Sequence, residues 1–305
     1  MKIKFNKLIL TAALIGIILI ILFAVFQTRS PVLIVIDESF INLYGTKRLR
    51  NQTISNSLVM FRNVKTVSVA NDVSDDMIPF AVQNFSSQPY CVLFPMRFAK
   101  SAEIYHALNP DIRVVILEGR NSEDINTSAN LFRYKTDIET DFYKAGIVAA
   151  SIKSPVESVN EDSDDVVIKR YMIAFLEPLF NRLHGTKVRS SFLKGINEDE
   201  NPPEVWFYTA FSDYYQILGL SCIILAGSGA EYLENTRGIP VILYSWLDPS
   251  LAPANVILII DDSPWAQAVQ AVKLAVSGEE EGLIKSKFLI PDAEKIDKTI
   301  LRKIR

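Results

Sequence analysis

The sequence predicts an α/β protein built from two Rossmann-like lobes, preceded by an apolar N-terminal helix. Two observations indicate the lobes. Short apolar runs, most of them rich in β-branched residues, alternate with helical stretches, and this alternation stops and starts again after Thr136. Continuous apolar strands separated by helices are typical of parallel sheets that are covered on both faces. A third observation, the uncharged run Leu8–Phe26, predicts the N-terminal helix.

The uncharged run Leu8–Phe26 follows Lys2, Lys4 and Lys7. At ~1.5 Å per residue it nearly spans the ~30 Å apolar core of a bilayer. The lysines favour a cytoplasmic N-terminus, and the run has no convincing small-x-small cleavage site. Residues 1–30 are therefore expected to be an uncleaved signal anchor in the cytoplasmic membrane, with the bulk of the chain outside the cytoplasm. A cleaved signal peptide is the competing interpretation.

The first series of elements follows this segment directly. Four apolar runs are expected to be strands, and three stretches between them are expected to be helices, the last of which stops at Asn109-Pro110. The strands are Pro31–Asp37, Val64–Ala70, Tyr90–Met96 and Ile112–Glu118, and the helices are Lys47–Phe61, Asp75–Phe85 and Arg97–Leu108.

The second series repeats the pattern. Its strands are Tyr171–Glu177, Val205–Ala210, Ser221–Ala226, Pro240–Ser245 and Val256–Ile260, and its helices are Asp141–Lys153, Gly185–Ile196, Ala230–Asn235 and Trp265–Val276. The acidic segment Pro155–Asp165 interrupts the pattern and is expected to be a solvated loop, because it lacks the regular ligand spacing and glycine of a calcium loop.

The composition argues against several classes of function. A net charge of −3 gives no basic surface, so nucleic acid is not an expected partner. The two histidines and two cysteines lie apart in the sequence, which leaves little material for a metal site or a nucleophile–histidine pair. Gly227-Ser228-Gly229 is not the G-x-S-x-G of a nucleophile elbow. No enzymatic activity, metal or cofactor is expected, and Cys91 and Cys222 are expected to be buried free thiols.

The candidate site is at the carboxyl ends of the strands, where open parallel sheets bind their ligands. Aromatic side chains there could stack on a flat ring while carboxylates accept hydrogen bonds from ligand hydroxyls or an amine. Phe40 and Trp246 are expected to hold such a ring from opposite lobes. In the alternative interpretation, the aromatic residues close the core of each lobe and the acids are simply solvated. The candidate ligand-binding residues are Asp37, Ser39, Phe40, Phe98, Phe211, Gly227, Trp246 and Asp248.

Four stretches carry a resemblance to a known family. Asp37–Asn42 resembles a D-x-S-F-N turn, Thr140–Ala150 an E-G-x-Y-L-A-G-x-x-A-A helix opening, and Leu225–Gly229 an A-G-x-G turn. Val256–Val276 resembles the strand and helix that return to the first lobe. The chain thereby resembles the type I periplasmic binding fold, and within it the basic membrane protein group of ABC-transporter receptors, which includes purine-nucleoside receptors.

The resemblance implies a chain that crosses its hinge three times. One lobe would contain residues 31–137 plus 258–305, and the other would contain residues 138–257. It also implies capture of a small polar, nucleoside-like ligand between the lobes, for delivery to an ABC permease. The chain departs from the family's pattern at two places. One acid of the family's late aspartate pair is replaced by Trp246. The family's lysine in the returning segment would fall near Asp261-Asp262-Ser263, where this chain has no lysine. These departures favour the alternative of a degenerate receptor with a sensory or protein-interaction role.

Overall fold

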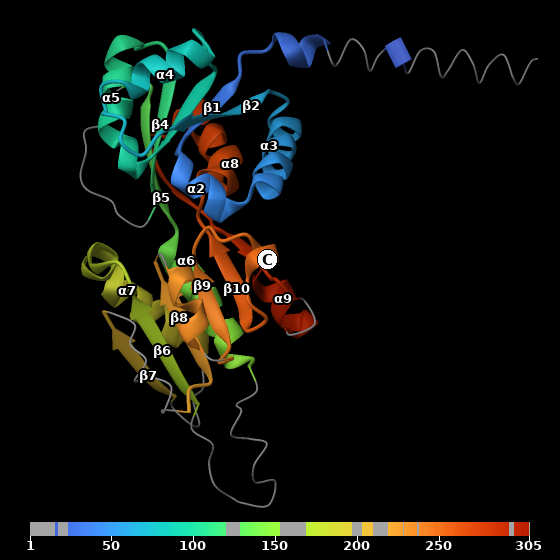
Figure 1. The fold of residues 1–305 in the computed structure, drawn as a ribbon, viewed down its shortest axis with the longest axis vertical. Helices are drawn as coiled ribbons and strands as arrows, with labels where there is room; N and C mark the ends of the chain where they lie inside the picture. The colour runs from blue at the N-terminus through green and yellow to red at the C-terminus, as the bar shows by residue number, and fades with distance from the viewer. Residues whose placement is uncertain are drawn as a thin grey trace, which may run out of the picture.

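The computed structural model describes residues 16–17, 24–119, 129–152, 169–196, 203–209, 219–227, 229–236, 238–292 and 296–304. The predicted ligand residue Phe211, the acidic segment Pro155–Asp165 and most of the apolar run Leu8–Phe26 lie outside the described residues. Figure 1 shows two lobes stacked along the long axis, each with a sheet at its centre.

The first lobe is built on a parallel sheet of six strands in the order β11-β5-β4-β3-β1-β2. Helices α2, α3 and α8 pack on one face of this sheet, and α4 and α5 pack on the other. The strands are β1 (Val32–Asp37), β2 (Val64–Val69), β3 (Cys91–Pro95), β4 (Arg113–Gly119), β5 (Leu131–Thr136) and β11 (Glu281–Ile284). The helices are α2 (Glu38–Tyr44), α3 (Thr46–Met60), α4 (Ile78–Phe85), α5 (Ala99–Leu108) and α8 (Pro264–Ser277).

The second lobe has a sheet in the order β12-β10-β9-β8-β6-β7, parallel except for β12, which pairs antiparallel with β10. Helices α6, α7 and α9 cover one face. The strands are β6 (Arg170–Phe175), β7 (Glu204–Tyr208), β8 (Cys222–Ala226), β9 (Val241–Tyr244), β10 (Val256–Asp261) and β12 (Lys287–Leu289). The helices are α6 (Ile138–Ala150), α7 (Pro178–Ile196) and α9 (Lys298–Ile304). The predicted α/β class with two mostly parallel sheets is confirmed.

The chain passes between the lobes at three crossings. They are Asp137 between β5 and α6, Asp262-Ser263 between β10 and α8, and Lys285-Ser286 between β11 and β12. Here the structure differs from the expected division, which put all of 258–305 in the first lobe. Only α8 and β11 join the first lobe, whereas β12 and α9 return to the second. The reason is that β12 hydrogen-bonds to β10 and Ile304 is buried in the core beside α6.

The expected membrane anchor has to be corrected. Among the described residues, no helix combines the length and apolar character that crossing a bilayer requires. A span needs ~20 apolar residues, and only the short pieces 16–17 and 24–31 are described before the first strand. The expected localisation in the cytoplasmic membrane depended on that anchor and is therefore wrong.

Candidate ligand-binding pocket between the lobes

A cavity of about 380 Å³ opens between the lobes. This volume lies within the range of small-molecule sites, ~300–1,000 Å³. The strands β1, β3, β4, β6 and β9 all end near it, so the loops that follow these strands supply most of its wall. The described residues that line it are Phe40, Leu43, Pro95, Met96, Arg97, Leu117, Glu118, Gly119, Glu177, Leu179, Ser245, Trp246, Asp262, Pro264 and Gln267.

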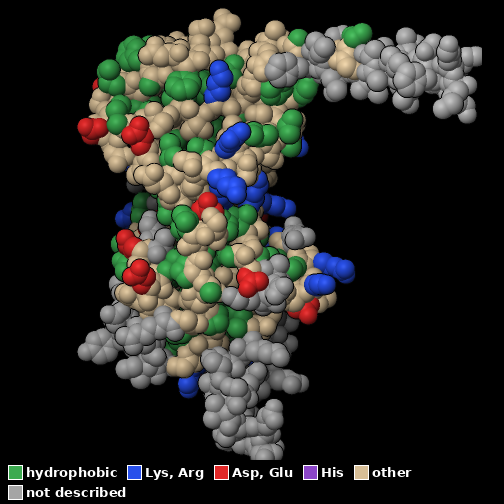
Figure 2. All heavy atoms as spheres, turned by 45° about the vertical axis from the view of Figure 1, so that its right-hand side comes forward, with side chains coloured by type: hydrophobic (Ala, Val, Ile, Leu, Met, Phe, Trp, Pro, Cys, Tyr) green, Lys and Arg blue, Asp and Glu red, His purple; other side chains and the backbone are tan. Residues whose placement is uncertain are grey.

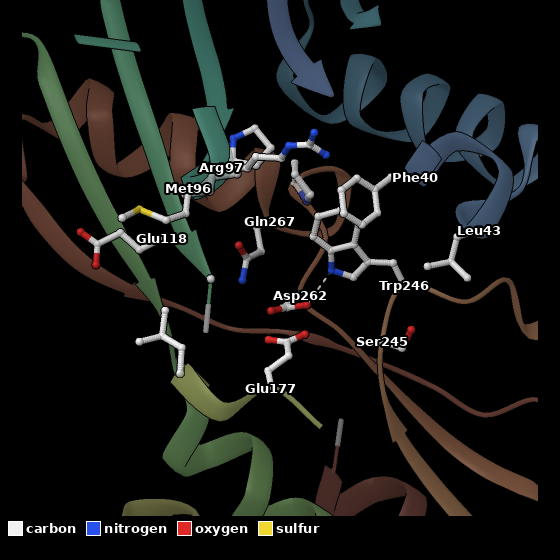
Figure 3. A pocket seen from close by; sticks show the side chains of 15 residues that line it. Phe40, Leu43, Met96, Arg97, Glu118, Glu177, Ser245, Trp246, Asp262 and Gln267 are labelled. Atoms are coloured by element: carbon white, nitrogen blue, oxygen red, sulfur yellow. Dashed lines mark hydrogen bonds between the residues drawn. The ribbon is translucent and has the colours of Figure 1, made fainter. Parts of the chain in front are cut away.

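Two predicted aromatic residues meet in this pocket from opposite lobes. Phe40 lies in α2 and Trp246 follows β9, and their ring centroids are 4.5 Å apart at an interplanar angle of 52°. The indole Nε1 of Trp246 also donates a hydrogen bond of 2.7 Å to Asp262 Oδ1, which fixes the ring (Figure 3). A flat ring held between two others needs about 7 Å between their planes, twice the ~3.5 Å contact distance of carbon atoms. The two rings therefore contact each other here and leave no space for the expected ring between them.

Polar groups occupy the centre of the pocket. Figure 3 shows the carboxylates of Glu177 and Asp262 directed toward the same region, near the carboxamide of Gln267. Asp262 and Gln267 are almost fully buried, and Gln267 Nε2 donates a hydrogen bond of 2.9 Å to Thr136 Oγ1 at the end of β5. The pocket wall thus carries several hydrogen-bond acceptors that face the cavity.

Glu118 contributes differently, because its carboxylate points away from the pocket centre (Figure 3). It forms an ion pair with Arg133, with 2.6 Å between Oε1 and Nε, and both side chains are buried. Burial raises the pKa of Glu118, and the positive charges of Arg133 and Lys135 oppose that rise. The residue stabilises the wall of the pocket and offers its aliphatic part to the cavity.

Asp37 and Ser39 form a helix cap beside the pocket. Asp37 Oδ1 accepts hydrogen bonds from the backbone N of Ser39 at 2.9 Å and from its hydroxyl at 2.8 Å, which caps α2. The other oxygen, Oδ2, forms an ion pair with Arg97. Asp37 is fully buried, so Arg97 rather than Asp37 lines the cavity. The cap positions Phe40 at the pocket, because Phe40 lies in the first turn of α2.

The remaining predicted residues that the structure describes lie outside the cavity wall. Phe98 is buried in the core of the first lobe. Gly227 adopts φ +120°, and a Cβ there would lie 3.0 Å from Glu177 Cγ, so the missing side chain leaves room for a residue that lines the pocket. Asp248 caps the short 3-10 helix Pro249–Leu251, accepting from Ser250 N at 2.9 Å.

Sequence reasoning did not select Arg97, Glu177, Asp262 or Gln267 as ligand residues. Three of them follow strand ends, a position that could have identified them. Gln267 lies in the first turn of α8 and carries no such signal, because only the return of α8 to the first lobe places it at the cavity.

One side of the pocket is closed by direct contacts between the lobes. Arg48 in α3 donates to the backbone oxygens of Trp246 at 3.2 Å and Leu247 at 2.8 Å, and it forms an ion pair with Asp261 at the end of β10. Leu43 O accepts a hydrogen bond of 3.1 Å from the backbone N of Asp248. Arg48 therefore fixes the backbone of the pocket residue Trp246 against the first lobe.

Figure 2 shows a narrower waist at the junction of the lobes, with several Lys and Arg side chains gathered on this face.

Among the described residues, no group of three or more His, Cys, Asp or Glu side chains is placed to hold a metal ion. The arrangement in the cavity is suited to stacking and hydrogen bonding.

The sequence and the fold were compared with those of known proteins. No protein-family model and no curated protein matches the sequence. Solved structures do match. An ABC-transporter solute-binding protein from Conexibacter woesei DSM 14684 is 10% identical with a TM-score of 0.59, over 90% of this chain and 94% of that one. A second one, from Aeropyrum pernix K1, is 10% identical with a TM-score of 0.55, over 90% and 89%.

A third match is titled a transcriptional activator of the comK gene from Bacillus halodurans. It is 15% identical with a TM-score of 0.58, over 90% of this chain and 95% of that one. The protein thus has a type I periplasmic binding protein-like fold, as the sequence resemblance implied. The narrower resemblance to the basic membrane protein group is not confirmed and stays a prediction.

Proposed function

We propose that the protein is a solute-binding protein that captures a small polar ligand in the interlobe pocket. The observation that carries this proposal is the pocket itself, which has the volume of a small-molecule site and is lined from both lobes at the carboxyl ends of parallel strands. Ligand contacts to both lobes would stabilise one hinge arrangement over others.

The chemistry of the wall defines the ligand class. Glu177, Asp262 and Gln267 present acceptor oxygens, so the ligand carries hydroxyl or amino donors. The exposed face of Trp246 or Phe40 would pack against a ring or an apolar edge. A nucleoside combines these features and is the first ligand to test, because the resemblance to purine-nucleoside receptors points the same way. Its delivery to an ABC permease is part of this proposal, since two of the matched structures are titled ABC-transporter solute-binding proteins.

The test uses the purified full chain. Mass spectrometry of the denatured protein would reveal a co-purifying small molecule, and a thermal-shift panel of nucleosides, sugars, amino acids and polyamines would identify others. A ligand that binds the folded protein raises Tm, because it adds RT ln(1 + [L]/Kd) to the free energy of unfolding. Trp246→Phe, which loses the hydrogen bond to Asp262, should weaken a binder about 10-fold. Trp206→Phe in β7, remote from the cavity, is the matched control.

The second candidate is a receptor-like protein with a sensory or protein-interaction role and no transported ligand. Its support is the direct contact of Phe40 with Trp246, which fills the space that a stacked ring would take. One matched structure is also titled a transcriptional activator. If the panel and the mass spectrum yield no small molecule while the protein is folded, this candidate replaces the first.

A further inference from the structure

The three crossings between the lobes converge on one buried acid, Asp141 in the first turn of α6. The helix begins directly after the first crossing, Asp137. Ser286, on the third crossing, donates a hydrogen bond of 2.6 Å from Oγ to Asp141 Oδ2. Asp262, on the second crossing, is close enough for its charge to act on Asp141. One carboxyl group thus interacts with every segment that connects the lobes.

The two oxygens of Asp141 have different surroundings. Oδ2 accepts the bond from Ser286 and a second one of 3.0 Å from the hydroxyl of Tyr244, at the end of β9. Oδ1 is buried and has no hydrogen-bond partner. A buried carboxylate oxygen without a partner destabilises the ionised form, because it has lost its hydration without replacement.

The charged groups around Asp141 do not offset this loss. Asp137 and Asp262 are negative and oppose its ionisation, and the bonds from Ser286 and Tyr244 favour ionisation only in part. Lys144, one turn further along α6, attracts the charge, and the exposed Lys285 lies on the third crossing beside Ser286. Burial is the largest cause and raises the pKa of Asp141 to about 7.

We propose that Asp141 is a pH-sensitive hinge residue, whose protonated form stabilises the present arrangement of the lobes and whose ionised form favours an arrangement that admits water to Oδ1. The sign follows from burial. Oδ1 is buried and without a hydrogen-bond partner in this arrangement. Ser286 and Asp262, which interact with Asp141, lie on the connecting segments, so a hinge movement that shifts them would change this burial, and ionisation stabilises any geometry that hydrates Oδ1. This device depends on the hinge alone and operates with or without a ligand in the pocket.

The experiment measures hinge opening without ligand. A donor–acceptor dye pair, one dye on each lobe at Cys residues introduced for Glu103 and Lys187, would report the interlobe distance by FRET between pH 5.5 and pH 8.5. Both positions are in outer helices, α5 and α7. We expect the distance distribution to change with a midpoint near pH 7 in the parent protein. Amide hydrogen exchange at the crossings should increase over the same range.

Asp141→Asn carries a neutral side chain of the same shape, so it should keep the low-pH distribution at every pH. Glu139→Gln, an exposed acid in the same helix, should retain the full pH response. A response that persists in Asp141→Asn overturns the proposal, and so does a parent protein whose interlobe distance and exchange stay constant across the range. If Asp141→Asn fails to fold, Ser286→Ala provides the second variant. It removes a bond that favours ionisation, so the midpoint should move to higher pH, and an unchanged midpoint also overturns the proposal.

Discussion

Replacing Arg48 by Met should destabilise the protein strongly, because Arg48 neutralises a fully buried acid. The Arg48 side chain is 14% exposed, whereas Asp261, at the end of β10, is completely buried. Removing one partner of such a pair typically costs ~3–5 kcal/mol, since the other charge stays buried without compensation. At ~2–4 °C per kcal/mol for a chain of comparable size, Tm should fall by about 6–20 °C.

The loss should depend on pH. Burial raises the pKa of Asp261 above its ordinary value, and Arg48 limits that rise. Without Arg48 the folded-state pKa of Asp261 rises further. At pH values above that pKa, the variant therefore loses the full unfolding free energy that burying an ionised Asp261 costs. That cost is relieved as the pH falls through the folded pKa toward the unfolded value. The difference between parent and variant should therefore be large at pH 8 and smaller at pH 5, as measured by urea unfolding at both pH values.

A double variant separates the charge from the packing. Arg48→Met combined with Asp261→Asn has no buried charge at this position, and the Asn oxygen can still accept the hydrogen bond from Ser263 N that Asp261 Oδ1 accepts at 2.9 Å. The double variant should recover much of the stability that the single variant loses. If Arg48→Met costs under about 1 kcal/mol, the pair behaves like an exposed one and the reasoning is refuted. Equal stability of the single and double variants would refute it as well.

Two further predictions follow from close packing and burial. Gly195→Ala should cost ~1–3 kcal/mol of unfolding free energy, because a methyl group there would overlap the carbonyl oxygen of Tyr143 where α6 crosses α7. A variant as stable as the parent in urea unfolding would contradict this contact. Cys91 and Cys222 should resist alkylation by iodoacetamide at pH 8 and react after unfolding, since burial raises both thiol pKa values, that of Cys91 to about 12. Rapid labelling of the folded protein, followed by mass spectrometry, would show that one of these strands opens.

Much of the fold was predictable because its signals are local. The runs that became β1, β3, β8 and β10 are continuous apolar segments, and each forms a strand that is buried along its length. The residues that follow strands were predictable too: Phe40 comes after β1 and Trp246 after β9, and both line the cavity. Parallel sheets leave the carboxyl ends of strands open to a ligand, and that rule operates on sequence order alone.

Other features depended on competing hydrogen-bond partners. Asp37 ends β1 and Asp248 follows β9 as expected, yet their carboxylates cap α2 and the turn at Pro249–Leu251, because the nearest backbone N–H groups compete with a ligand. Arg97 was assigned to the predicted helix after the third strand. Its guanidinium lies at the pocket, where it forms an ion pair with Asp37 and donates a hydrogen bond of 3.2 Å to Asn71 O.

The sequence by itself determined the α/β class, the two series of strands and the edge of the sheets at which the interlobe cavity lies. These features follow from the periodicity of apolar residues and from the direction of parallel strands. Only the tertiary structure decided that α8 and β11 return to the first lobe while β12 and α9 return to the second. It also decided that Phe40 contacts Trp246 and that all three crossings interact with Asp141. Contacts between segments more than 100 residues apart have no local signature, because they are selected by the complementarity of surfaces that exist only once both lobes have folded.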